Sequence, residues 1–171
     1  MRSDVLGPGG AVNEQRGSAT ALAIGRILVP VDFSDCSLAA LDHAASLAQR
    51  FGASIHVLHV WDHRDQTLAH FAQTGAGEAM DSVLGDLEQH GVGGVRGRLA
   101  SGDPSETIIQ IAREEHYDLI VMGTHGHSGL VHLLHGSVAE KVVRRAPCPV
   151  LTVRTVDPPG DRTAADEPPT D

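Results

Sequence analysis

Strand-like and helix-like segments alternate along the middle of this chain, and this alternation constrains the fold more than any other feature. Five apolar runs have the length and composition of buried strands, and each of the first four is followed by a segment with a helical pattern. The predicted strands are 27–31, 55–60, 95–100, 118–122 and 149–154. Parallel strands need long crossovers, and right-handed helical crossovers cover both faces of a sheet, so the pattern predicts a doubly wound α/β domain.

The ends of two predicted helices carry local signals. Ser34 is an N-cap candidate for a helix that should end at Gly52. The segment 103–106 offers an acidic N-cap, a proline at the first helical position and a glutamate three residues after the cap. The other two helices are expected to cover about 77–89 and 136–145.

Glycines gather in the segment that follows the fourth predicted strand. Gly123, Gly126 and Gly136 allow backbone N–H groups to approach an anion, and Ser137 can cap the helix that begins there. Backbone amides next to a helix N-terminus favour a phosphate group as the ligand. The alternative is that these glycines only shape a turn and a helix start.

The position of the glycines predicts the order of the strands. In doubly wound sheets, ligands lie beyond the carboxyl ends of the strands at the point where the winding reverses. Because the glycines follow strand four, we expect the reversal between strands one and four, which gives the order 3-2-1-4-5. Asp32, just after the first strand, should then face the glycine segment. The alternative role for Asp32 is to cap the first helix or its turn.

Length and charge limit the number of domains and the kinds of partner. The 171 residues suffice for one core, and we expect one domain over 26–154 between flexible tails at 1–25 and 155–171. With 13 basic and 22 acidic residues, the net charge of −9 opposes binding to nucleic acid or an anionic membrane. Cys36 and Cys148 lack the spacing of a disulfide framework or zinc site, and neither a transmembrane run nor a signal-peptide pattern is evident, so we expect a cytoplasmic protein.

Four segments together resemble the universal stress protein family. They are Val-Pro-Val-Asp-Phe-Ser at 29–34, Leu-His-Val at 58–60, Asp-Leu-Ile-Val-Met-Gly at 118–123 continuing into Gly-x-x-Gly-(nine residues)-Gly-Ser, and the run 138–151. The resemblance covers about residues 25–154 and implies a single domain with the adenine nucleotide alpha hydrolase-like form of the doubly wound fold. The intact glycine pattern is similar to that of the family members that bind ATP.

The resemblance also implies roles for individual residues. Asp32 would lie beside the ribose, and Val60 would offer main-chain atoms to the adenine. Gly123 and His125 would flank the sugar and phosphates, and the later glycines with Ser137 would wrap the phosphate chain. The expected nucleotide-binding residues, in chain order, are Pro30, Val31, Asp32, Val60, Met122, Gly123, Thr124, His125, Gly126, Gly136, Ser137 and Val138.

The phosphate segment departs from the family pattern at one position. Many relatives carry Arg or Lys after the second glycine, where this chain has His127, which is charged only part of the time near neutral pH. The only lysine of the sequence, Lys141, lies on the following helix, and the segment has no arginine to stabilise transferred charge. We therefore expect an ATP-binding regulatory protein of the stress response. The alternatives are a slow ATPase, with Mg²⁺ or Mn²⁺ bridging the phosphates, and a dimeric adaptor with a vestigial nucleotide site.

Three further features have simple expected roles. The four histidines at 125, 127, 132 and 135 could hold a transition metal, but solvent exposure or nucleotide contact is the favoured interpretation. Cys36 is expected to be a small buried residue, with oxidant sensing as the alternative. The last strand would be a sheet edge whose apolar residues predict a symmetric homodimer through 149–154.

Overall fold

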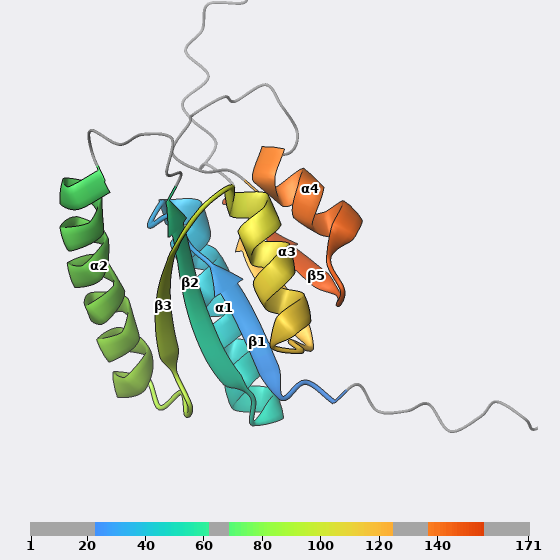
Figure 1. The fold of residues 1–171 in the computed structure, drawn as a ribbon. Helices are drawn as coiled ribbons and strands as arrows, with labels where there is room; N and C mark the ends of the chain where they lie inside the picture. The colour runs from blue at the N-terminus through green and yellow to red at the C-terminus, as the bar shows by residue number, and fades with distance from the viewer. Residues whose placement is uncertain (1–22, 62–68, 125–136, 156–171) are drawn as a thin grey trace, which may run out of the picture.

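The computed structural model describes residues 23–61, 69–124 and 137–155, and the side chains of 69–74 and Ser137 are outside this description. Five parallel strands form one sheet in the order β3-β2-β1-β4-β5 (Figure 1). The strands are β1 (Arg26–Pro30), β2 (Ser54–Trp61), β3 (Arg96–Ser101), β4 (Leu119–Gly123) and β5 (Val150–Val153). The helices are α1 (Asp35–Phe51), α2 (Ala69–Gln89), α3 (Pro104–Glu114) and α4 (Ser137–Arg145). The predicted fold class and strand order are confirmed.

Helices cover both faces of the sheet, and alternate strand residues build a separate core on each face. One core joins α1 and α2 to strand residues such as Ile27, Val29 and Val57. The other joins α3 and α4 to strand residues such as Leu28 and Leu58. Figure 1 shows α3 and α4 on one side of the sheet and α1 behind it. This two-sided burial explains why the predicted strands are continuous apolar runs rather than alternating patterns.

The local helix signals act as the sequence predicts. Ser34 is the N-cap of α1, and its hydroxyl accepts a hydrogen bond from the Ser37 N–H at 3.4 Å. Gly52 ends α1 in the left-handed conformation with a φ of 68°. Asp103 caps α3 by accepting from the Glu106 N–H at 3.1 Å, and Pro104 opens the helix. Each signal uses a short side chain or a glycine to satisfy helix-end groups, so it operates without long-range contacts.

The start predicted for α2 is wrong by eight residues, since the helix begins at Ala69 rather than near Gly77. The glycines at 75 and 77 lower helix propensity and therefore shortened the predicted helix. Burial of Met80, at 4% exposure, and of Leu87, at 5%, anchors the helix to the core in spite of these glycines. The predicted bounds of the other elements agree with the structure to within about two residues. Within the described residues, the helices are too short or too polar to cross a membrane.

Candidate functional site

The winding of the sheet reverses between β1 and β4, where the sequence predicts a ligand site. These strands pair in parallel, with Ile27 opposite Leu119 and Leu28 opposite Ile120. The chain leaves β1 for α1 on one face of the sheet, whereas α4, on the opposite face, follows β4. The carboxyl ends of β1 and β4 therefore meet at one edge, and a doubly wound sheet is open to a ligand at this point.

Asp32 lies directly after β1 and organises the turn into α1. Its Oδ1 accepts hydrogen bonds from the Ser34 N–H at 3.1 Å and from the Ser34 hydroxyl at 2.5 Å. The side chain is half-buried. The capping role that the sequence left open for Asp32 is thus realised in the structure. A carboxylate held in this way is also fixed in position at the carboxyl edge of β1, which is what a ribose contact would require.

Phe33 and His59 form a contact at this edge that the sequence did not indicate. Phe33 adopts a φ of 61°, a conformation that bulky residues rarely adopt, and its ring centroid lies 4.9 Å from that of His59. The Nδ1 of His59 lies 2.9 Å from the carbonyl oxygen of Val31, so Nδ1 carries the proton and Nε2 is left as the acceptor of the neutral ring. Backbone strain of this kind concentrates at functional sites. The only sequence signal for His59 was its place one residue before Val60.

Gly123 ends β4 in close contact with the first turn of α1. A Cβ added to Gly123 would lie 3.0 Å from the carbonyl carbon, the carbonyl oxygen and the Sγ of Cys36. These distances are tighter than most real Cβ contacts, so a side chain here needs the first turn of α1 to shift by a few tenths of an ångström. Packing alone therefore favours glycine at this position, whatever ligand binds beyond it.

Cys36 is buried, as the sequence predicts, and its Sγ donates to the carbonyl oxygen of Val153 at 3.4 Å. Cys148 is half-buried, and burial, together with the nearby Asp118 carboxylate, raises the pKa of its thiol. A buried thiol and a thiol with a raised pKa are both poor nucleophiles at neutral pH. Neither cysteine has the surroundings of a redox sensor.

Four of the expected nucleotide-binding residues have buried side chains, namely Pro30, Val31, Met122 and Thr124. Thr124 is 2% exposed, and both its N–H, at 3.0 Å, and its hydroxyl, at 3.3 Å, donate to the carbonyl oxygen of Val153. Met122 and Val31 belong to the two cores. At these positions only main-chain groups are left for a ligand. Thr124 also fixes the point from which the chain leaves β4 toward the glycine segment.

Some of the remaining expected nucleotide-binding residues lie among the described residues, and the others lie outside them. Val60 is half-buried at the end of β2, Val138 is half-buried on α4, and Pro30 is buried at the end of β1. His125, Gly126 and Gly136 lie outside the described residues, as does the side chain of Ser137. The four histidines considered as metal ligands also lie there. Among the residues that the structure describes, no group of three or more His, Cys, Asp or Glu side chains is placed to hold a metal ion.

Comparisons with known proteins agree with this geometry. The model of the universal stress protein family matches residues 23–154. Universal stress protein MJ0531 of Methanocaldococcus jannaschii is 34% identical over 139 residues, which cover 75% of this chain and 81% of the relative. The solved structure of MJ0577 from the same organism is 32% identical with a TM-score of 0.73, and the match covers 80% of this chain and 99% of that one.

A third similar structure is a universal stress protein solved in complex with cAMP. It is 27% identical with a TM-score of 0.63, and the match covers 78% of this chain and 99% of that one. The family model covers well over half of this chain, and the five-stranded fold matches solved structures of universal stress proteins. The chain belongs to the universal stress protein family.

Proposed function

We propose that this protein binds ATP at the carboxyl edge between β1 and β4 and acts as a nucleotide-responsive regulator. The observation that carries the proposal is the winding reversal, which brings Asp32 and Gly123 to one edge of the sheet. The glycine-rich segment begins immediately beyond Thr124, and α4 begins where that segment ends. The complex of a related protein with cAMP supports an adenine nucleotide as the ligand class.

The residues at this edge fit the parts of a nucleotide. The half-buried carboxylate of Asp32 can accept hydrogen bonds from ribose hydroxyls. Val60 would contribute main-chain N–H and C=O groups, which are suitable partners for the polar edge of adenine. The phosphates would be held by backbone amides of the glycine segment and by the N-terminus of α4, where the helix dipole favours negative charge.

Binding without efficient hydrolysis is the activity that we propose. The only lysine of the sequence, Lys141, is an exposed residue within α4, and the glycine segment carries His127 where a permanent cation would hold the phosphates more firmly. Arginine or lysine groups that stabilise transferred charge commonly contribute factors of about 10³ or more in phosphoryl transfer. Occupancy of the site, rather than turnover, would then change the surface that the protein presents to a partner.

Dimerisation through β5 is part of the proposal. β5 is the last strand in the sheet order and pairs with β4 on one side. Leu151 on this strand is a large apolar side chain that is 39% exposed. A second copy pairing with this edge would cover Leu151 and the outer backbone groups of β5, which pair with no other strand that the structure describes.

The test is a calorimetric titration of nucleotide-free protein with ATP and Mg²⁺. The parent is compared with Gly126→Glu, which places a carboxylate in the glycine segment, and with Gly93→Glu as the matched control. Gly93 is exposed, and a Cβ there would meet no atom within 4 Å, so the control adds the same charge without a clash. We expect micromolar affinity, about −8 kcal/mol, that is lost in Gly126→Glu and kept in Gly93→Glu. Absence of ATP binding by the parent would refute the proposal and leave a dimeric adaptor. Titrations with AMP and cAMP rank the ligands.

A further inference from the structure

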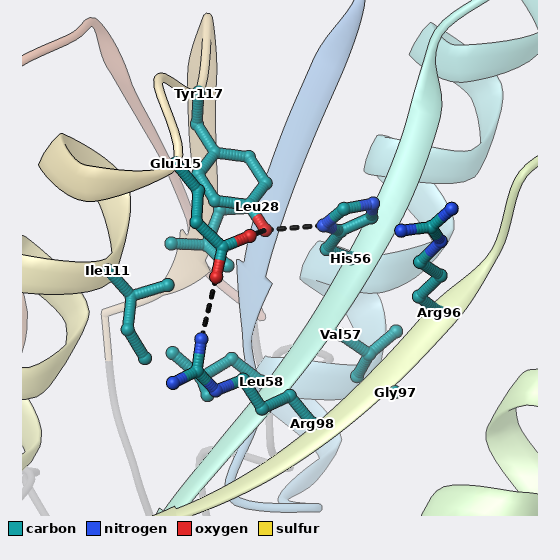
Figure 2. Close-up of a pocket in the computed structure, with 10 residues that line it drawn as sticks. All are labelled: Leu28, His56, Val57, Leu58, Arg96, Gly97, Arg98, Ile111, Glu115 and Tyr117. Atoms are coloured by element: carbon teal, nitrogen blue, oxygen red, sulfur yellow. Dashed lines mark hydrogen bonds and ion pairs between the residues drawn. The ribbon is translucent and has the colours of Figure 1, made fainter.

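A cavity separate from the site just described lies on the face of the sheet that α3 covers, nearer the amino-terminal ends of the strands. Its volume is about 200 Å³ (Figure 2). The deep side of the cavity is apolar and consists of Leu28, Leu58 and Ile111, which are 1%, 1% and 4% exposed. The polar side carries His56 and Arg96 in the first half of β2 and at the start of β3. The nucleotide site, by contrast, is proposed at the carboxyl ends of the strands.

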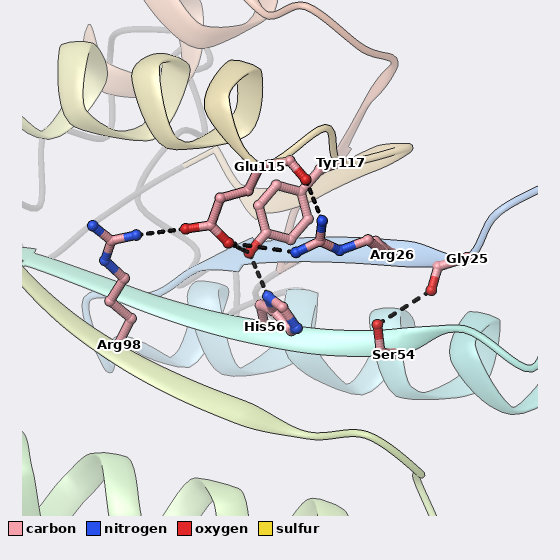
Figure 3. A network of polar contacts seen from close by, with 7 residues as sticks. All are labelled: Gly25, Arg26, Ser54, His56, Arg98, Glu115 and Tyr117. Atoms are coloured by element: carbon pink, nitrogen blue, oxygen red, sulfur yellow. Dashed lines mark hydrogen bonds and ion pairs between the residues drawn. The ribbon is translucent and has the colours of Figure 1, made fainter.

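Positive charge dominates the polar side of this cavity, although the chain as a whole carries a net charge of −9. Glu115, in the turn after α3, is its only carboxylate among the described lining residues. Glu115 is shared by two arginines, Arg98 at 2.6 Å and Arg26 at 3.4 Å (Figure 3). Arg96 is a third guanidinium, and among the described residues it has no hydrogen-bond or ion-pair partner. The cavity therefore has cationic groups in excess of the carboxylate that neutralises them.

His56 is held at the centre of this cluster by a chain of polar contacts. The Tyr117 hydroxyl donates to Oε2 of Glu115 at 3.1 Å, and the same hydroxyl oxygen contacts Nδ1 of His56. Because the hydroxyl has one proton and gives it to the carboxylate, Nδ1 of His56 is the donor to Tyr117, and Nε2 is left for a further partner. In Figure 2 the His56 ring lies between Tyr117 and Arg96.

The charges around His56 come from β1, from β3 and from the turn after α3. Arg26 on β1, Arg96 and Arg98 on β3, and Glu115 and Tyr117 after α3 all face this region. Burial lowers the pKa of His56, and the charges of Arg26 and Arg96 lower it further, while Glu115 opposes them. His56 is also the direct cross-strand partner of Arg96, so two cationic groups would face each other if His56 were protonated. An anion placed between them would relieve this repulsion.

We propose that this cavity binds a small organic anion whose acidic group lies against Arg96 and His56 and whose apolar body rests on Leu28, Leu58 and Ile111. A guanidinium group presents a planar fork of donors that matches a carboxylate or a phosphate. An apolar cavity of about 150 Å³ holds benzene, so a 200 Å³ cavity accommodates a ring together with its acidic group. This site is independent of the proposed nucleotide site, because it shares no residue with it.

Titration of the full chain with benzoate tests the proposal. Benzoate has no phosphate group to occupy the glycine segment, and it keeps one negative charge throughout the pH range in which histidine titrates. Ring-proton NMR signals of the histidines report the binding, and His56→Gln identifies the signal of His56. We expect a dissociation constant of about 1 mM and a pKa of His56 that rises when benzoate is bound.

Arg96→Gln and Arg113→Gln form the matched pair of variants. Both remove one exposed arginine, but Arg113 lies on α3 and does not line the cavity. Charge-assisted hydrogen bonds make Arg96→Gln about tenfold or more weaker in benzoate affinity, whereas Arg113→Gln stays within about twofold of the parent. Absence of saturable binding, equal weakening in both variants, or an unchanged pKa of His56 would each overturn the proposal. A parallel titration with phenyl phosphate is followed at the His56 signal, so that binding at the glycine segment is not counted. Tenfold tighter binding of one probe at His56 shows whether the cavity prefers a carboxylate or a phosphate.

Discussion

Replacing Gly123 with alanine should destabilise the domain, although alanine often stabilises a protein when it replaces an exposed glycine. The new Cβ would lie 3.0 Å from three atoms of Cys36, two of which belong to the backbone of the first turn of α1. To relieve this contact, β4 and α1 must separate by a few tenths of an ångström. Both elements are fixed on other sides, since Thr124 is bonded to Val153 and α1 is packed in the core.

The expected size of the effect follows from two opposing contributions. Overpacking in a tight interior costs about 1–3 kcal/mol. Removing a glycine returns about 0.4–1 kcal/mol, because the unfolded chain becomes less flexible. The net loss should be about 1–2 kcal/mol in the free energy of unfolding, which lowers the melting temperature by about 4–7 °C for a domain of this size.

Urea unfolding followed by circular dichroism, on nucleotide-free protein, measures this loss. Gly85→Ala is the matched control, because Gly85 lies within α2 and its Cβ would meet nothing within 4 Å. That control should gain up to about 1 kcal/mol from helix propensity. In the double variant Gly123→Ala with Cys36→Ala, the removal of Sγ should restore little, because the carbonyl carbon and oxygen remain in place. If Gly123→Ala were as stable as the parent, the close approach of β4 to α1 would be refuted.

Two further predictions concern a helix cap and the sheet edge. Asp103→Ala should cost about 1 kcal/mol by removing the N-cap of α3, while Asp103→Asn should keep most of the cap at neutral pH. Hydrogen bonds from the Ser105 hydroxyl and then the Glu106 N–H lower the pKa of Asp103 from its ordinary value of 3.8. The charge of Asp103 therefore stabilises the fold above the unfolded-state pKa, and this stabilisation is lost as the pH falls through the lowered pKa of the folded state. Unfolding curves from pH 7 downward should therefore show a smaller acid loss in Asp103→Asn than in the parent, and identical losses would contradict the assignment. Leu151→Lys should shift the sedimentation of the protein from dimer to monomer, whereas Phe51→Lys, at another exposed apolar side chain, should leave it unchanged; a parent that sediments as a monomer would remove the proposed dimer.

The parts of the fold that could be predicted from the sequence are those governed by local chemistry or by general rules of topology. Ser34, Gly52 and Asp103 mark helix ends because each satisfies backbone groups within a few residues of itself. The strand order followed from the position of the glycines and the rule that ligands lie where the winding reverses. The start of α2 was missed because the low helix propensity of the glycines at 75 and 77 suggests that no helix forms there. In the structure, packing of the rest of α2 against the sheet outweighs this low propensity.

Contacts between distant parts of the chain could not be predicted from the sequence. The contact of Tyr117 with His56 joins residues 61 positions apart, and the cavity beside it also needs Arg96 from a third segment. Nothing in the local sequence of these residues distinguishes them from solvent-exposed polar groups on strands. The contact of Phe33 with the His59 ring likewise joins two segments that are distant in the sequence.

The packing role of Gly123 weakens the evidence that the glycine pattern gives for a phosphate site. Sequence reasoning counts every glycine of the pattern as support for a phosphate site, because each one could open the backbone to an anion. In the structure, the close contact of β4 with Cys36 also favours glycine at position 123, and it would do so even if the protein bound no nucleotide. The same holds for Thr124, whose N–H and hydroxyl are both directed to Val153. The residues that can distinguish a working nucleotide site from a vestigial one are therefore Gly126, Gly136 and Ser137. For this reason the decisive substitution belongs at Gly126 rather than at Gly123, where a loss of ATP binding could come from the packing of β4 on α1.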